Sequence, residues 1–168
     1  MAKECKSGSN ESCLADLKNN YSILSKKYSL PSFEELNQEF QIEKLAEIET
    51  DYLLREIRKF ITEKFSNYLN FIETLLNPAS AHMFVFTVIK TLENKDKENL
   101  SELYKKLSRK EVETIRLDLD FSEKSEAEFI KNSFEFWKNI KDGLLEIVAV
   151  IEKNWDVKVE KVGKGYFG

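Results

Sequence analysis

Apolar residues recur every three or four positions from Tyr52 to Leu76, a spacing that places them along one side of a helix. The positions are Leu54, Ile57, Ile61, Phe65, Tyr68, Ile72 and Leu75. Asn77 and Pro78 follow, and proline cannot continue a helix. At about 1.5 Å per residue this helix would be about 38 Å long. The pattern predicts a long amphipathic helix that other helices must cover.

A second long stripe begins after Ser125, which forms a predicted capping box with Glu128. Its apolar positions are Phe129, Ile130, Phe134, Trp137, Ile140, Leu144, Val148, Ile151 and Trp155. This helix would be about 45 Å long and should pack against the first.

Shorter helices are predicted before the first long one. One begins near Ser12 and ends at Leu30, before Pro31. Ser32 and Glu35 then form a capping box that opens a short helix. Between Phe40 and Asp51, acids alternate with aliphatic residues, and this segment either extends the long helix backwards or forms two turns of its own.

The middle of the chain is harder to assign. Residues 83–92 are apolar on nearly every side, so they fit a central helix or a buried strand, and the proline cap at Pro78 favours the helix. Leucines at 100, 103 and 107 form another helical stripe, and Ser108 with Glu111 predicts a new helix start and so a helical hairpin. Residues 115–121 alternate like a strand, which leaves extended chain or a helix end open.

Composition favours helices as well. The chain has 168 residues, 42% of them hydrophobic and 33% charged, with 5 glycines and 2 prolines, too few for the many turns of a sandwich or barrel. We therefore predict an all-α, single-domain bundle of five to seven helices, two of them long, with a short extended C-terminal segment. Its buried residues should include Ile57, Ile61, Phe65, Ile72, Phe86, Ile89, Leu103, Trp137, Leu144 and Val148. The bundle should span residues 12–155, between a disordered lead (1–11) and a basic tail (156–168) that is an edge strand or mobile.

The first thirty residues are polar and lack the apolar region of a signal peptide, so we expect a cytoplasmic protein. No apolar run approaches the roughly 20 residues that cross a bilayer, so we expect no membrane association. Cys5 and Cys13 should be free thiols, since no second pair completes a zinc site or a disulfide framework.

Candidate chemistry is sparse. His82 is the one histidine of the chain, which excludes sites that need paired histidines. No phosphate-binding loop is present, since Gly163-Lys164-Gly165 stands in no strand–helix pattern. We expect no catalytic residue, no metal and no cofactor, and we expect a protein that is not an enzyme.

Two clusters are candidates for partner binding. The first holds four cations within six residues, which could contact phosphates or could simply favour the end of a helix. The second combines lysines with aromatic residues in the tail, where rings could stack on bases or anchor in a groove of a partner. Their members are Lys105, Lys106, Arg109 and Lys110 in the first cluster and Lys158, Lys161, Lys164, Tyr166 and Phe167 in the second.

These observations favour a non-catalytic helical interaction or adaptor protein, acting through surface contacts with a protein partner or with a second copy of itself. The alternative is an accessory factor of a nucleic-acid machine, such as a ribosome, replication or RNA-processing assembly, which would use the basic clusters. An enzyme of a type that leaves no motif is the third reading.

Overall fold

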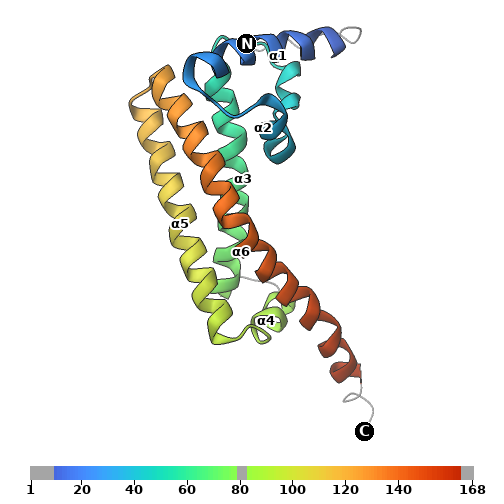
Figure 1. Ribbon diagram of the computed structural model, residues 1–168. Helices are drawn as coiled ribbons and strands as arrows, with labels where there is room; N and C mark the ends of the chain where they lie inside the picture. Colours follow the sequence, from blue (N-terminus) through green and yellow to red (C-terminus); the bar gives the residue numbers. More distant parts are fainter. Residues whose placement is uncertain (1–9, 79–82, 164–168) are drawn as a thin grey trace. The chain divides into compact units, whose positions relative to one another are not determined.

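The computed structural model describes residues 10–78 and 83–163, and beyond Lys153 it describes the backbone alone. Of these described residues, 87% are helical and none form a strand, which confirms the all-α fold. The described helices follow one another as shown in Figure 1. They are α1 (Asn10–Tyr28), α2 (Phe33–Phe40), the short 3-10 helix η1 (Ile42–Glu47), α3 (Leu53–Leu76), α4 (Met83–Ile89), α5 (Asn94–Leu119) and α6 (Glu123–Gly163).

The chain divides into two compact units, and α3, α5 and α6 each contribute to both. Unit 1 contains the chain up to Phe65 together with Lys110–Phe136, and unit 2 contains Ser66–Arg109 and the chain from Trp137. The single domain predicted over residues 12–155 stays a prediction. Residues 1–9 of the predicted lead lie outside the described part, whereas Asn10 and Glu11 already belong to α1.

In unit 1 the capping box at Ser32 is confirmed. The Ser32 hydroxyl accepts a hydrogen bond from the Glu35 N–H at 3.2 Å, and the Glu35 carboxylate accepts one from the Ser32 N–H at 2.9 Å. Helix α2 ends where Gln41 adopts a left-handed conformation with φ of 54°. The next residues form η1, which packs against α1, so the segment before α3 makes its own turns and does not extend α3.

The first half of α3 supplies the core of unit 1 in the predicted register. Ile57, Ile61 and Phe65 are all buried. The Phe65 ring meets Phe40 and Phe136 edge to face, with centroids 6.2 and 5.4 Å away. Aromatic pairs of this geometry add about 0.5–1.5 kcal/mol beyond the burial of their area.

Helix α5 corrects the prediction of a helical hairpin with a new helix start at Ser108. It is one continuous helix, and with α3 and α6 it makes three long helices where two were predicted. The buried side of α5 continues past Leu107 through Lys110, whose ammonium lies 5.5 Å from the centroids of Phe129 and Phe136. The buried side of α5 therefore continues through a lysine whose aliphatic chain is packed in the core. Residues 115–119 are helical, not extended.

In unit 2, α4 is a helix, as predicted. Leu103, Trp137 and Leu144 are buried as expected, and the Trp137 ring lies 5.4 Å from Tyr68. The expectation that Phe86, Ile89 and Val148 are buried is wrong, since Phe86 and Val148 are exposed and Ile89 is half-buried. Each of the three lies on an outer side of its helix that the stripe pattern did not distinguish from the core.

The N-terminal cap of helix α6 lies three residues earlier than predicted. The Ser122 hydroxyl accepts a hydrogen bond from the Ser125 N–H at 3.1 Å, so Ser122 is the cap and Ser125 lies inside the helix, correcting the predicted box of Ser125 and Glu128. The helix then continues to Gly163. The first part of the predicted tail, up to Gly163, is thus helical and not an edge strand.

Candidate functional site

A buried ion-pair cluster joins α3 to the start of α6 and the end of α5 within unit 1. The Arg58 Nε donates to Glu126 Oε2 at 2.7 Å, and the Arg58 Nη2 donates to Asp118 Oδ1 at 2.7 Å. Arg58 and Glu126 are both buried, whereas Asp118 is exposed. The cluster fixes three helices to one another, because each buried charge must keep its partner.

The Glu126 carboxyl is only partly satisfied by this cluster. Its Oε1 is buried and has no hydrogen-bond partner among the described residues. Burial raises the pKa of Glu126 above its usual value, although Arg58 and Arg55 act in the opposite direction. A buried carboxyl with a raised pKa at the edge of a cavity is typical of functional sites, and it also occurs in structural ion pairs.

A cavity of about 360 Å³ lies beside this carboxyl, bounded by α1, by the turn before α3 and by the start of α6. Tyr52 and Phe121 lie at its edge, are well exposed and meet edge to face with centroids 5.8 Å apart. Arg55, from the first turn of α3, lies 5.8 Å from the centroid of Phe121. The cavity thus combines exposed aromatic rings with charged groups.

A second feature of unit 1 is a row of exposed aliphatic side chains on α5. Val112, Ile115 and Leu119 are 66%, 59% and 84% exposed. Their spacing of three and four residues places them on one side of the helix. We call these three residues the α5 stripe. Soluble proteins seldom leave a contiguous apolar row uncovered unless it serves an interaction.

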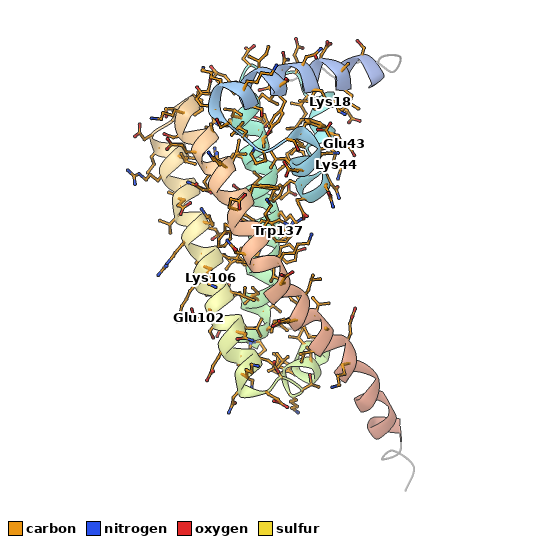
Figure 2. All side chains as sticks on the ribbon, viewed as in Figure 1. Lys18, Glu43, Lys44, Glu102, Lys106 and Trp137 are labelled. Atoms are coloured by element: carbon orange, nitrogen blue, oxygen red, sulfur yellow. The ribbon has the colours of Figure 1, made fainter. Side chains whose placement is uncertain are left out.

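The predicted basic cluster is divided between the two units. Lys110, in unit 1, is buried and its ammonium forms an ion pair with Glu113 at 2.6 Å, so it offers little to a partner. In unit 2, Lys105 pairs with Glu102 at 2.8 Å. Lys106 and Arg109 are exposed, and Lys106 lies one helical turn after Glu102 (Figure 2).

The ion pair of Lys105 with Glu102 in unit 2 is exposed to solvent. Hydrogen bonding from Lys105 holds the pKa of Glu102 below its usual value, and Lys106 and Arg109 add to this. Exposed pairs of this type contribute little to stability. Lys106 and Arg109 therefore remain candidate contacts, and their partner role stays a prediction.

The predicted tail cluster falls largely outside what the structure describes. Lys158 and Lys161 lie on the last turns of α6, where the backbone alone is described. Lys164, Tyr166 and Phe167 lie outside the described residues, as does His82. The proposed partner role of the tail stays a prediction.

Sequence reasoning missed both features of unit 1. Two members of the α5 stripe, Ile115 and Leu119, were assigned to an alternation that left extended chain or a helix end open, although the spacing at 112, 115 and 119 was a signal that could have shown the stripe. The cavity carries no such signal, because its residues come from three separate segments.

Within residues 10–78 and 83–163, no group of three or more His, Cys, Asp or Glu side chains could hold a metal ion. In the same residues, no helix is both long enough and apolar enough to span a bilayer. Comparisons with protein-family models, with curated proteins and with solved structures gave no significant match to this chain.

Proposed function

We propose that this chain is a non-catalytic interaction protein that binds an amphipathic helix of a partner protein along the α5 stripe. The observation that carries the proposal is the exposure of Val112, Ile115 and Leu119 on one side of a well-formed helix. Burying an aliphatic side chain of this size contributes about 1.5–3 kcal/mol. The stripe is therefore large enough to supply the central contacts of an interface.

The opposite side of α5 in unit 1 is already occupied by its own neighbours. Lys110 is buried against aromatic rings, and the Thr114 hydroxyl lies 3.4 Å from that of Thr62 on α3. The α5 stripe is thus not an alternative packing face for the core of unit 1. It supports binding from outside.

The spacing of the stripe indicates the form of the partner. Grooves and helix faces that bind an amphipathic helix use anchors at positions i, i+3 or i+4 and i+7, which is the spacing of these three residues. Glu113 and Arg116 lie beside the stripe and are exposed. They supply charges of both signs for a polar rim around an apolar centre.

A nucleic-acid role is the second candidate, supported by the exposed Lys106 and Arg109 in unit 2. Two such cations contact about two phosphates, whereas typical duplex binders make about 6–10 phosphate contacts. Their electrostatic contribution to binding is therefore small. Binding that weakens steeply with salt and is lost in a variant with both residues changed to Gln would support this role.

The test of the main proposal begins with capture of partners by the full-length chain and reconstitution with each purified partner. Ile115→Ser should raise the Kd about 30-fold, the loss of about 2 kcal/mol that marks a central interface residue. Leu145→Ser is the matched control, because Leu145 is a similarly exposed aliphatic residue of unit 2. Both changes should leave the free energy of unfolding within about 0.5 kcal/mol.

Equal affinities of the two variants and the unchanged chain for every reconstituted partner would contradict the proposal. Sedimentation velocity tests whether a second copy of this chain, and not another protein, covers the α5 stripe. If the free chain is a dimer that Ile115→Ser dissociates, the partner helix is a second copy and the proposed hetero-interaction is wrong.

A further inference from the structure

The cavity beside Glu126 has a distinctive charge balance that the proposed interaction does not use. Glu123 lines it and accepts hydrogen bonds from Lys27 at 2.8 Å and from the Tyr28 hydroxyl at 2.7 Å. Glu126 lines it and is paired with Arg58 at 2.7 Å. Glu123 and one carboxylate oxygen of Glu126 therefore already have charged partners within the protein.

Two further charged groups, Asp51 and Arg55, line the same cavity, and Arg55 also favours the charged form of Glu126 through space. Neither Asp51 nor Arg55 forms a side-chain hydrogen bond or ion pair within the part of the chain that the structure describes. They lie four residues apart, at and just before the first turn of α3, yet they do not pair with each other. One charge of each sign that makes no direct ion pair among the described residues thus borders this cavity.

The Arg55 side chain is held in place by its surroundings. Its guanidinium carbon lies 5.8 Å from the centroid of the Phe121 ring, and its Nε is buried. The terminal N–H groups of a guanidinium form a planar fork that matches the two oxygens of a carboxylate. Leu53 and Leu54 of the first turn of α3 also line the cavity, and the N–H groups of a first helical turn, which have no acceptors within the helix, favour an anionic group.

The geometry points to a binding site for a zwitterionic amino acid with an apolar side chain. Arg55 binds the carboxylate, Asp51 binds the ammonium group, and Tyr52 and Phe121 pack against the side chain. A cavity of about 360 Å³ lies within the range of small-molecule sites, roughly 300–1,000 Å³, at the small end where a free amino acid fits.

Charge complementarity separates this ligand class from its single-charge relatives. A plain carboxylate would leave Asp51 unpaired next to it, and a plain amine would do the same to Arg55. The site does not depend on the α5 stripe, so this inference stands or falls separately from the proposed interaction.

The experiment is isothermal titration of the full-length chain with three probes that share one ring. These are L-phenylalanine, 3-phenylpropionate, which has the carboxylate alone, and phenethylamine, which has the ammonium alone. L-phenylalanine should bind at least about tenfold more tightly than either analogue, because each analogue loses one charged contact. Equal binding of all three probes, or no heat with L-phenylalanine at millimolar concentrations, would overturn the inference.

Substitutions assign the two charges. Arg55→Gln should weaken L-phenylalanine and 3-phenylpropionate but leave phenethylamine unchanged, and Asp51→Asn should do the reverse. Arg116→Gln is the matched control, since Arg116 is an exposed arginine of unit 1 that does not line this cavity. Unchanged affinity for L-phenylalanine in Arg55→Gln would overturn the inference. If Arg55→Gln fails to fold, Arg55→Lys, which keeps the charge but loses the fork, takes its place.

Discussion

Unit 1 and unit 2 bury different chemistry although both are built from the same long helices. Among the described residues, the buried polar or charged side chains are Arg58, Lys110, Glu126 and Ser133, and all of them lie in unit 1. The core of unit 2 described here is made of leucine, isoleucine, valine and tryptophan. Buried charges require defined partners, so unit 1 has a more specific interior, and its cavity and α5 stripe lie on the same unit.

The comparison indicates a division of roles. An apolar core stabilises a unit without constraining the position of any polar group, whereas an ion pair such as Arg58 with Glu126 fixes helices in one register. Features that could recognise a ligand or a partner occur where positions are fixed in this way.

The largest effect that would sharpen the comparison is expected from Arg58→Ala in unit 1. The change leaves the Glu126 carboxylate buried without its partner, and the free energy of unfolding should fall by about 3–5 kcal/mol. Urea denaturation measures the change. Arg109→Ala, which removes an exposed arginine of unit 2, should stay within about 0.5 kcal/mol.

The double variant Arg58→Met with Glu126→Gln separates the lost pair from lost packing. It removes both charges and should recover much of the stability lost in Arg58→Ala, because no buried charge remains unpaired. A near-neutral Arg58→Ala would show that the pair is solvated, and the contrast between the units would not hold.

Unit 2 should instead respond most to loss of apolar volume. Ile72 is fully buried, and Ile72→Ala should lower the free energy of unfolding by about 2–5 kcal/mol through lost burial and a cavity. Phe71→Ala is a demanding control, since Phe71 is the preceding residue on α3 and is exposed. Equal losses in the two variants would show that this face of α3 is not a core face.

A smaller and pH-dependent effect is expected from Glu126→Gln. Burial raises the pKa of Glu126 above 4.5 in the folded state, so the folded chain holds this proton more tightly than the unfolded chain does. Its stability relative to Glu126→Gln should therefore fall as the pH rises from 4.5 through the folded pKa. Arg58 and Arg55 oppose the shift, and the nearby Asp118 adds to it.

Chemical denaturation of both chains over this pH range measures the difference. A stability of the unchanged chain that increases relative to Glu126→Gln with rising pH would mean that the two arginines outweigh burial, and the raised pKa would be wrong.

The smallest effect concerns Gly143 in the interior of α6, within unit 2. A Cβ at this position would lie 3.5 Å from the Leu103 side chain, which is ordinary van der Waals contact. Gly143→Ala should therefore raise the free energy of unfolding by about 0.4–1 kcal/mol, because alanine restricts the unfolded chain. Thermal unfolding checks the sign, and a destabilised variant would show tighter packing than the structure indicates.

The elements of the fold were predictable where local rules decide. The stripe of α3 and the capping box at Ser32 each depend on residues close in sequence, and both were found. The helix break predicted at Ser108 is wrong because the buried side of α5 continues through Lys110, which a hydrophobic pattern counts as polar. The alternation after Ile115 left extended chain or a helix end open, because apolar residues that face outward on a helix imitate a strand, and the structure shows the helix end.

The candidate sites were less predictable for a physical reason. Glu126 meets Arg58 across a sequence separation of 68 residues, and local spacing contains no information on such a pair. The same holds for the cavity, where Asp51 and Arg55 matter because Glu123 pairs with Lys27 and one oxygen of Glu126 pairs with Arg58. In the predicted basic cluster, closeness in sequence was misleading, since one of the four neighbouring cations, Lys110, is buried in the fold.

The most direct test of whether partner binding belongs to unit 1 is site-specific photo-crosslinking in cells. A benzophenone amino acid replaces Ile115 in one full-length variant and Leu145 in another, both at exposed positions of long helices. The account predicts a discrete crosslinked protein at position 115 that is lost when Leu119 is also changed to Ser, and no such product at position 145. The same product at both positions, or a product at position 145 alone, would contradict it.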